Sequence, residues 1–284
     1  MSEPNENVVE EYRTEHSWIR VYREATGVPI LFIHGYPLDS SFWSNQIEHF
    51  RKKHVVIAID LRGFGKSEIS SDSMEKPKAE YSMASLADDC IDGLDACGIR
   101  GPIVVCGLSM GGYVAFEIWK RHASRVGALI LCDTRAGADS AESAKQRLVT
   151  ADRLAKEGTP AVVTPMLERL LSPETRQASP ALVEGLLKMM HSVPPTTIAL
   201  AQRAMAKRAD FDSSLNQIAQ PTLLIVGESD VISTPKEMNE MASKMPNAVI
   251  RVIKNSGHLP PIEQTDAFNS ALEEFFVEQL SQLF

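Results

Sequence analysis

Cysteines are few in this sequence of 284 residues, and none forms a metal or redox motif. Cys90, Cys97, Cys106 and Cys132 contain no C-x-x-C pair, and four cysteines in a chain of this length do not make a disulfide framework. Cys106 and Cys132 end apolar runs, where a buried cysteine packs as a small hydrophobic residue. We therefore expect reduced thiols that serve packing rather than chemistry.

Basic charge and long apolar runs are also scarce. The chain has 29 lysines and arginines against 37 acidic residues, and the resulting net charge of −8 repels a phosphate backbone or an anionic membrane surface. No apolar run reaches the ~18 residues of a spanning helix. The acidic first residues, MSEPNENVVEEYRTEH, lack the basic and apolar regions of a secretory signal. These absences predict a cytoplasmic protein without a nucleic-acid or membrane partner.

Motifs for metals and phosphates are missing as well. No segment has the H-E-x-x-H pattern of a zinc site or the spacing of a calcium-binding loop. The segment from Asp60 to Ser67 ends in Gly-Lys-Ser, but a phosphate-binding loop would require glycine at position 60. We therefore expect neither a metal nor another cofactor.

Apolar runs alternate with helical patterns along most of the chain. The runs are nearly continuous, which indicates strands buried on both faces of a mostly parallel sheet. They are VPILFI from Val28, HVVIAI from His54, PIVVCG from Pro102, GALILC from Gly127, PTLLIV from Pro221 and AVIRVI from Ala248. An earlier run, SWIRVYRE, alternates polar and apolar residues, which predicts an antiparallel edge strand with one solvated face.

The predicted helices between these runs complete the pattern. Apolar residues at helical spacing favour helices over Met83–Ala96, Gly111–Lys120 and Thr265–Leu283. Strands and helices that alternate in this way predict an α/β fold with a doubly wound sheet.

One interval interrupts the alternation. The segment from Arg135 to Gln220 contains no convincing strand and is too long for an unstructured loop in a compact domain. Breaks containing proline divide it into about four helices; they are Gly158-Thr159-Pro160, Ser172-Pro173, Ser179-Pro180 and Val193-Pro194-Pro195. We expect residues 1–134 and 221–284 to form the core and residues 135–220 a helical lid over the carboxyl edge of the sheet.

The strongest local motif is Gly107-Leu108-Ser109-Met110-Gly111, a G-x-S-x-G that follows one apolar run and opens a predicted helix. In a turn of this kind the serine is exposed between strand and helix, and bulky side chains two residues away on either side would collide. The simpler interpretation is a glycine-rich turn whose serine hydroxyl caps the helix. The strand before the motif and the helix after it favour Ser109 as a nucleophile.

A serine hydroxyl needs a base to accept its proton, and the base needs a group that orients it. His258 follows the last apolar run, and Asp230 follows the run before it, so both fall at the edge where Ser109 is expected. We predict a catalytic triad of Ser109, His258 as base and Asp230 as acid. Asp133 follows the run GALILC and is the rival acid; we assign it to holding local loop structure.

Five segments together identify a family. HGYPLDSSFW, DLRGFGKS, GLSMGGYVAFE, LLIVGESD and NSGHLPPIEQ, in this order, resemble the α/β-hydrolase superfamily over nearly the whole chain. The resemblance implies the α/β-hydrolase fold and its chain order Ser…Asp…His. The stretch LCDTRAGADSAESAKQR, with a helical lid after it, is most similar to the branch of 3-oxoadipate enol-lactonases and related carboxylesterases. Similar haloalkane dehalogenases and epoxide hydrolases have aspartate where this chain has Ser109.

The resemblance also implies an oxyanion hole. One donor is the backbone N–H after the nucleophile, here that of Met110, and the other comes from the loop that begins at His34, here most simply Tyr36. His34 directly precedes this loop. We expect it to brace the loop through hydrogen bonds rather than to act as a base.

These residues predict a serine hydrolase that cleaves a small carboxylic ester or lactone through an acyl-enzyme on Ser109. Perhydrolases and C–C bond hydrolases use the same triad, and some ligand receptors on this fold retain it, so these functions stay open as alternatives. The expected partner is a small ester or lactone substrate, and no oligomeric state is indicated.

Arg135 stands at the junction between the sheet and the lid. Its guanidinium could bind a substrate carboxylate, such as an enol-lactone carries, through two parallel hydrogen bonds. The simpler interpretation, which we favour, is an internal pair with Asp133, Asp139 or Glu142 that pins the lid.

Overall fold

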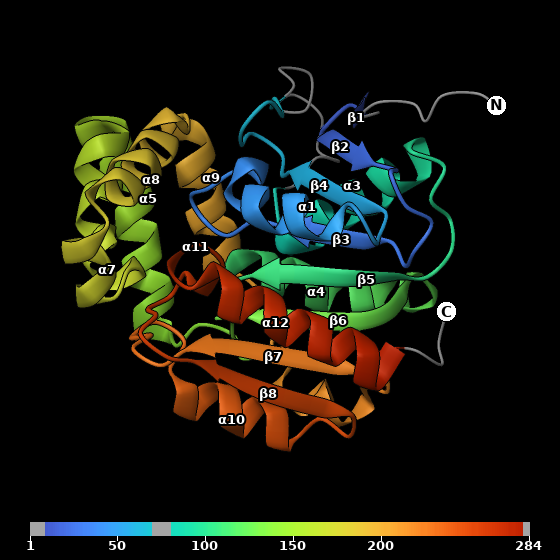
Figure 1. Cartoon of the computed structure of the whole chain (residues 1–284). Helices are drawn as coiled ribbons and strands as arrows, with labels where there is room; N and C mark the ends of the chain where they lie inside the picture. Colours follow the sequence, from blue (N-terminus) through green and yellow to red (C-terminus); the bar gives the residue numbers. More distant parts are fainter. Residues whose placement is uncertain (1–8, 70–80, 281–284) are drawn as a thin grey trace.

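The computed structural model in Figure 1 describes residues 9–69 and 81–280 around one eight-stranded sheet. The strands follow one another across the sheet in the order β1-β2-β4-β3-β5-β6-β7-β8. Their bounds are β1 Val9–Arg13, β2 Trp18–Tyr22, β3 Ile30–Ile33, β4 Val56–Asp60, β5 Ile103–Leu108, β6 Val126–Cys132, β7 Thr222–Gly227 and β8 Ala248–Ile253. The pairs β1–β2 and β2–β4 are antiparallel and the other neighbours are parallel. The predicted doubly wound, mostly parallel sheet is confirmed.

The inner strands are buried because helices cover both of their apolar faces. Every residue of β3, β4, β5 and β7 is buried. β8 differs from its prediction as a strand buried on both faces, because most of its residues are only half-buried and Val252 is 44% exposed. β8 pairs with β7 alone among the described strands, so its outer side faces solvent.

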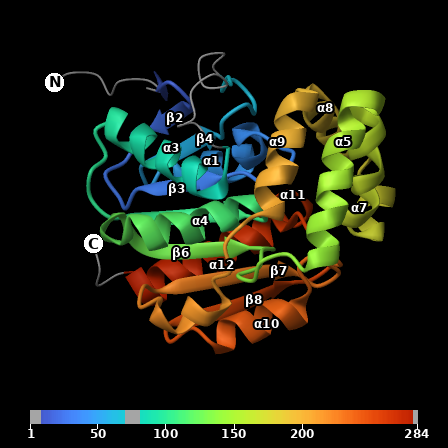
Figure 2. The ribbon, with the colours of Figure 1, turned by 180° about the vertical axis from the view of Figure 1, so that it is seen from behind.

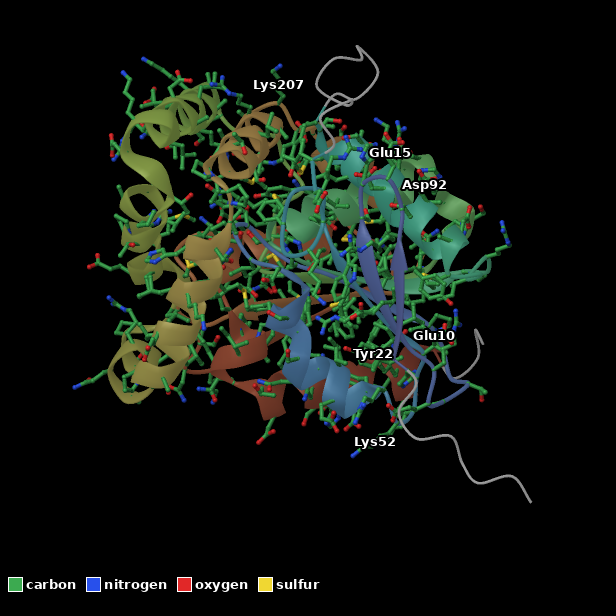
Figure 3. The ribbon with its side chains drawn as sticks, turned by 90° about the horizontal axis from the view of Figure 1, so that it is seen from above. Glu10, Glu15, Tyr22, Lys52, Asp92 and Lys207 are labelled. Carbon is green, nitrogen blue, oxygen red and sulfur yellow. The ribbon has the colours of Figure 1, made fainter. Side chains whose placement is uncertain are left out.

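The other edge is a hairpin that the sequence predicted only in part. β2 is antiparallel, as expected, but it is not an edge strand: it lies between β1 and β4, and four of its five residues are buried. The edge strand is β1, whose charged sequence VEEYR gave no strand signal. Figure 3 looks onto this hairpin, with Glu15 in its turn and Glu10 and Tyr22 at its other end.

Two layers of helices enclose the sheet. α1 Ser44–Phe50 and α12 Thr265–Phe275 cover one face, and α3 Met83–Ala96 and α4 Met110–Arg121 cover the other (Figures 1 and 2). α10 Pro235–Ser243 packs on β7 and β8 and buries Met238 and Met241 against them. The helix predicted to reach Leu283 instead ends at Phe275 and continues as a π-helical turn, Phe276–Leu280, after which the chain lies outside the described residues.

Helices fill the interval between β6 and β7, as predicted, but there are five rather than about four. They are α5 Ala141–Val163, α6 Leu167–Leu170, α7 Pro173–Ala178, α8 Pro180–Ser192 and α9 Pro195–Ala206. α7, α8 and α9 each begin at a predicted proline, and Gly158 (φ 75°, ψ 170°) bends α5 at the predicted break. In Figure 1 these helices lie beyond the carboxyl ends of the central strands. No helix in the described ranges is long and apolar enough to span a membrane.

A buried ion pair connects α3 to the segment after β4. Arg62 donates hydrogen bonds of 2.9 and 2.6 Å to the carboxylate of Asp89, and both side chains are at most 5% exposed. Burial raises the pKa of Asp89 although the Arg62 guanidinium opposes this shift. The neighbouring Asp88 pairs with Arg121 at the surface, where the two side chains are 40% and 42% exposed, and its carboxylate also lies 2.7 Å from Nε2 of His122.

These two aspartates form a matched pair for measuring the effect of burial. Asp89→Asn should lower the free energy of unfolding by about 3 kcal/mol, because it leaves the buried Arg62 guanidinium without a counter-charge. Asp88→Asn removes the solvent-accessible contacts with Arg121 and His122 and should cost less than about 1 kcal/mol. Urea denaturation of both variants measures the difference, and equal losses would mean that burial does not set the strength of these ion pairs.

Candidate active site

Ser109 lies at the sharp turn between β5 and α4. Its backbone has φ 52° and ψ −110°, a conformation that costs a non-glycine residue about 1–3 kcal/mol. Both backbone groups of Ser109 are hydrogen-bonded: its N–H donates to the Cys132 carbonyl at 2.8 Å, and its carbonyl accepts from the Thr134 hydroxyl at 2.8 Å. Ser109 occupies the N-cap position of α4, yet its side chain makes no capping hydrogen bond. The interpretation of Ser109 as a simple helix cap is therefore wrong.

The glycines around Ser109 are required by close backbone contacts. A Cβ atom at Gly107 would lie 2.3 Å from the Gly111 carbonyl oxygen, and one at Gly111 would lie 2.4 Å from the Ile33 carbonyl oxygen. These contacts confirm the steric argument drawn from the G-x-S-x-G pattern. A Cβ at Gly35 would lie 3.2 Å from the Leu108 carbonyl oxygen, so the loop after β3 also packs directly against this turn.

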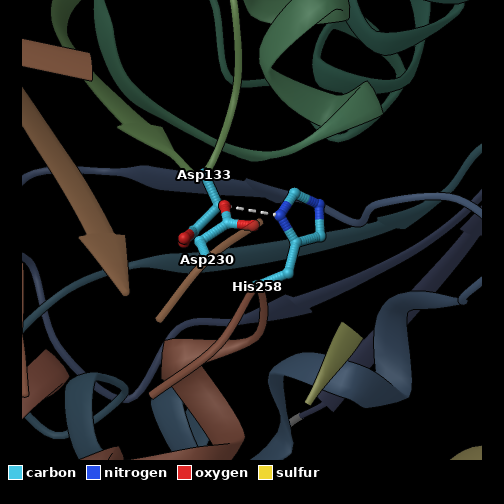
Figure 4. A group of neighbouring side chains, drawn as sticks. All are labelled: Asp133, Asp230 and His258. Carbon is cyan, nitrogen blue, oxygen red and sulfur yellow. Dashed lines mark hydrogen bonds and ion pairs between the residues drawn. The ribbon is translucent and has the colours of Figure 1, made fainter. Parts of the chain in front are cut away.

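His258 and Asp230 meet at the carboxyl edge of the sheet (Figure 4). Nδ1 of His258 lies 2.8 Å from Oδ2 of Asp230, and both side chains are buried. The Asp230 carboxylate also accepts backbone hydrogen bonds from Ile232 at 2.7 Å and Ser233 at 3.1 Å. These bonds fix the carboxylate, which in turn orients the imidazole. Because Nδ1 is engaged, Nε2 is the nitrogen that remains for proton exchange.

Asp133 joins this pair as a third buried group. It directly follows β6 with φ 45° and is fully buried, and its Oδ1 accepts a hydrogen bond of 2.9 Å from the Gly227 N–H. This bond ties the loop after β6 to the end of β7, as expected of a residue that holds local structure. Burial and the neighbouring Asp230 carboxylate raise the pKa of Asp133 well above its usual range.

The same three side chains are the candidate ligands for a metal ion. Within the described residues, ligand-type atoms of Asp133, Asp230 and His258 all lie within 4.8 Å of one another. Both oxygens of Asp230 and Nδ1 of His258 are already committed to hydrogen bonds within the protein. This arrangement suits the movement of protons better than the coordination of a cation.

A cavity of about 530 Å³ opens at Ser109 and His258 and is also lined by Tyr36 and Arg135. Most of its remaining wall comes from helices α5, α6 and α9 and from Tyr113 on α4. The sequence did not predict that several residues line this cavity: Tyr113, Asp139, Arg147 and Gln202. Of the methionines between β6 and β7, Met166 and Met205 line the cavity.

The loop after β3 and the start of α4 place two backbone amides near Ser109. Tyr36 belongs to the loop and Met110 is the first residue of α4. None of the hydrogen bonds formed among the described residues is donated by the N–H of Tyr36 or Met110. His34 braces this loop as expected: its Nδ1 donates to the Gly35 carbonyl at 2.9 Å, and its Nε2 accepts from the Leu61 N–H at 3.1 Å. Complete burial lowers the pKa of His34.

Arg135 forms an internal ion pair, but not with the predicted residues. Its Nη2 lies 3.1 Å from the carboxylate of Glu237 on α10 and also donates to the Ile232 carbonyl. The expected pair with Asp133, Asp139 or Glu142 is therefore wrong. Asp139 is already engaged by two other guanidiniums, those of Arg147 at 2.5 Å and Arg208 at 2.6 Å, which keep its pKa low despite burial.

Comparisons with known proteins agree with this geometry. A sequence model described as alpha/beta hydrolase fold matches residues 28–265. The chain is 27% identical to 3-oxoadipate enol-lactonase 2 of Acinetobacter baylyi over 252 residues, which cover 89% of this chain and 90% of that protein. Its structure resembles that of a thermophilic esterase from Thermogutta terrifontis with malate bound (TM-score 0.88, 36% identity, 95% of this chain and 98% of the esterase). It also resembles the enol-lactonase of Burkholderia xenovorans (TM-score 0.81, 26% identity, covering 92% of this chain and 97% of the enol-lactonase). The chain therefore belongs to the alpha/beta hydrolase fold family.

Proposed function

We propose that this chain is a serine hydrolase that cleaves a small carboxylic ester or lactone through an acyl-enzyme on Ser109. One observation carries the proposal: Ser109, whose hydroxyl takes no part in capping α4, and His258, which is hydrogen-bonded to Asp230, line the same cavity. A nucleophile, a base and an orienting acid are the parts that acyl transfer requires. The similarity to enol-lactonases and to an esterase supports the substrate class.

The proposed reaction proceeds in two halves. Nε2 of His258 accepts the proton of Ser109 as Oγ attacks the carbonyl carbon, and Asp230 stabilises the imidazolium that forms. The N–H groups of Tyr36 and Met110 donate to the oxyanion. The imidazolium then protonates the leaving alcohol oxygen as the C–O bond breaks; in a lactone this oxygen stays attached to the acyl group. In the second half, His258 accepts a proton from a water molecule that attacks the acyl carbon. The imidazolium then returns this proton to Oγ of Ser109 as the acyl–Oγ bond breaks and the carboxylic acid leaves.

We further propose that residues 135–220 act as a lid. Side chains from α5, α6 and α9 form much of the cavity wall, so these helices enclose a substrate bound at Ser109. An enclosed site excludes water and strengthens the electrostatic interactions on which the oxyanion depends.

Replacing the nucleophile gives the first test of the mechanism. Ser109→Ala should lower the turnover of a nitrophenyl ester by several orders of magnitude while the protein stays folded, since the residue supplies the attacking atom and only a small side chain is removed. Ser143→Ala removes another hydroxyl that lines the cavity and is the matched control, with an expected loss of at most a few-fold. A Ser109→Ala variant with a tenth of the wild-type rate would exclude this mechanism.

The pH dependence gives a second test. Because His258 must be neutral to accept the Ser109 proton, kcat/KM should rise with pH through the titration of a histidine and then level off. The measurement is a series of initial rates on a neutral ester between about pH 5 and 8. A flat profile over that range would argue against a histidine base.

We also propose that Arg135 binds a carboxylate on the substrate, in the manner that an enol-lactone would require. Arg135 lines the cavity, and its pair with Glu237 uses only Nη2. Its Nη1 has no acceptor among the described residues and is available to a bound anion, whereas its Nε also lacks an acceptor but is buried.

Two substrates of equal size separate this role from a purely structural one. Arg135→Ala should lower kcat/KM for an anionic ester far more than for its neutral counterpart, by roughly 10-fold or more, and the difference should shrink at high salt. Equal losses on both substrates would remove the binding role and leave only the contact that joins Arg135 to α10.

A further inference from the structure

The Asp133 side chain has one oxygen that the described structure leaves unbonded. Oδ1 accepts the Gly227 N–H, whereas Oδ2 is buried and has no hydrogen-bond partner. A buried oxygen without a partner costs about 1–3 kcal/mol, and more when it is charged. Something must therefore offset this cost at a position beside the proposed catalytic groups.

The surroundings of Asp133 do not favour a second negative charge. Ligand-type oxygens of Asp133 and Asp230 lie within 4.8 Å of each other, and the other titratable groups beside Asp133 are His258 and the Cys132 thiol. No lysine or arginine in the described ranges lies within 4 Å of Asp133 or Asp230. Two buried carboxylates this close cannot both ionise without a compensating cation, so one of them retains a proton.

The two carboxyl groups differ in the hydrogen bonds that they accept. Asp230 accepts from two backbone amides and from His258, and each of these bonds stabilises its charged form. Asp133 accepts one backbone bond. A proton on Oδ2 of Asp133 turns that unpartnered acceptor into a donor, and the neighbouring Asp230 carboxylate is its candidate acceptor.

We propose that Asp133 is a positioning residue that stays protonated and donates a hydrogen bond to Asp230, so that the two aspartates hold one proton between them. This inference rests on the proposed function. The pair then carries a single negative charge, which matches the single positive charge of the imidazolium formed during acyl transfer. When Asp230 is removed, its negative charge no longer suppresses the ionisation of Asp133. Asp133 can then ionise and partly replace Asp230 beside His258.

The pH profile of Asp133→Asn distinguishes a neutral Asp133 from an ionised one. The amide nitrogen can donate where the acid O–H did, so kcat/KM should fall by less than about threefold and the apparent pKa of its acid limb should move by less than ~0.3. Asp133→Leu has a similar size but no donor, and its kcat should fall by about tenfold or more. If Asp133→Asn lowered the apparent pKa of the acid limb by more than about one unit, both carboxylates would be charged and the proposal would fail.

Removal of Asp230 tests whether Asp133 can replace it. Asp230→Asn should be severely impaired, and its residual rate should keep rising at alkaline pH as Asp133 ionises. The double variant Asp133→Asn/Asp230→Asn should lack this rise and be slower by about tenfold. Identical pH profiles for the single and the double variant would overturn the replacement. Glu117→Gln, which removes another carboxyl with a pKa raised by burial but outside the catalytic cavity, is the control.

A measurement without turnover tests the shared proton independently of the proposed reaction. Above about pH 4 the unfolded wild-type chain releases the Asp133 proton, whereas the folded protein keeps it. The stability of the wild type should therefore fall as the pH rises towards neutral. Its thermal midpoint should drop relative to that of Asp133→Asn by about 2 to 3 °C per pH unit. A constant difference between the two midpoints over this range would refute the shared proton. If the thermal difference appeared while Ser109→Ala retained activity, the proposed function would fail and the shared proton would stand.

Discussion

Close backbone contacts at the turn between β5 and α4 determine where every other part of the cavity lies. The glycines at 107 and 111 allow carbonyl groups to approach positions that a Cβ would occupy, and the turn holds Ser109 with φ 52°. The cost of that conformation is offset by the buried neighbours of β5, because the ladders of β5 with β3 and β6 fix the strand end of the turn, while α4 continues from its other end. A larger residue at either glycine would displace the serine from the loop after β3.

The parallel strands extend this constraint to the rest of the site. Because β6, β7 and β8 run in the same direction as β5, their carboxyl ends reach the same edge of the sheet. The loops after β6, β7 and β8 therefore bring Asp133, Asp230 and His258 within 4.8 Å of one another, although they are far apart in the sequence. The two buried aspartates differ in their surroundings. The Asp230 carboxylate accepts three hydrogen bonds, whereas burial and the neighbouring Asp230 raise the pKa of Asp133.

The parts of the fold that were predictable are those encoded by local patterns. Continuous apolar runs identified the inner strands, because burial on both faces leaves no polar positions, and prolines identified the starts of α7, α8 and α9. Whether a strand lies at the edge depends on its partners. SWIRVYRE was wrongly predicted to be an edge strand, because β1 pairs with its outer side and the charged sequence of β1 carries no strand signal.

The candidate site was likewise predictable only where local sequence patterns encode it. The turn at Ser109 has its own sequence motif, and the order of the strands placed Asp230 and His258 at the same edge. The cavity wall formed by α5, α6 and α9 depends on how helices pack across long distances, so residues such as Arg147 and Gln202 carried no signal. The Glu237 partner of Arg135 was missed because it belongs to α10, which follows β7 and lies about a hundred positions further along the chain.

Direct observation of the acyl-enzyme is the sharpest test of the central claim that Ser109 carries the acyl group. The protein would be mixed with a nitrophenyl ester, quenched in acid during turnover, digested, and analysed by mass spectrometry. We predict one acyl group per chain, on the peptide that contains Ser109, appearing before the steady state and disappearing when the ester is consumed. We also predict that His258→Ala, which lacks the base, accumulates no such adduct over the same time. Rapid ester hydrolysis with no acylated peptide, or with the acyl group on another residue, would contradict the claim.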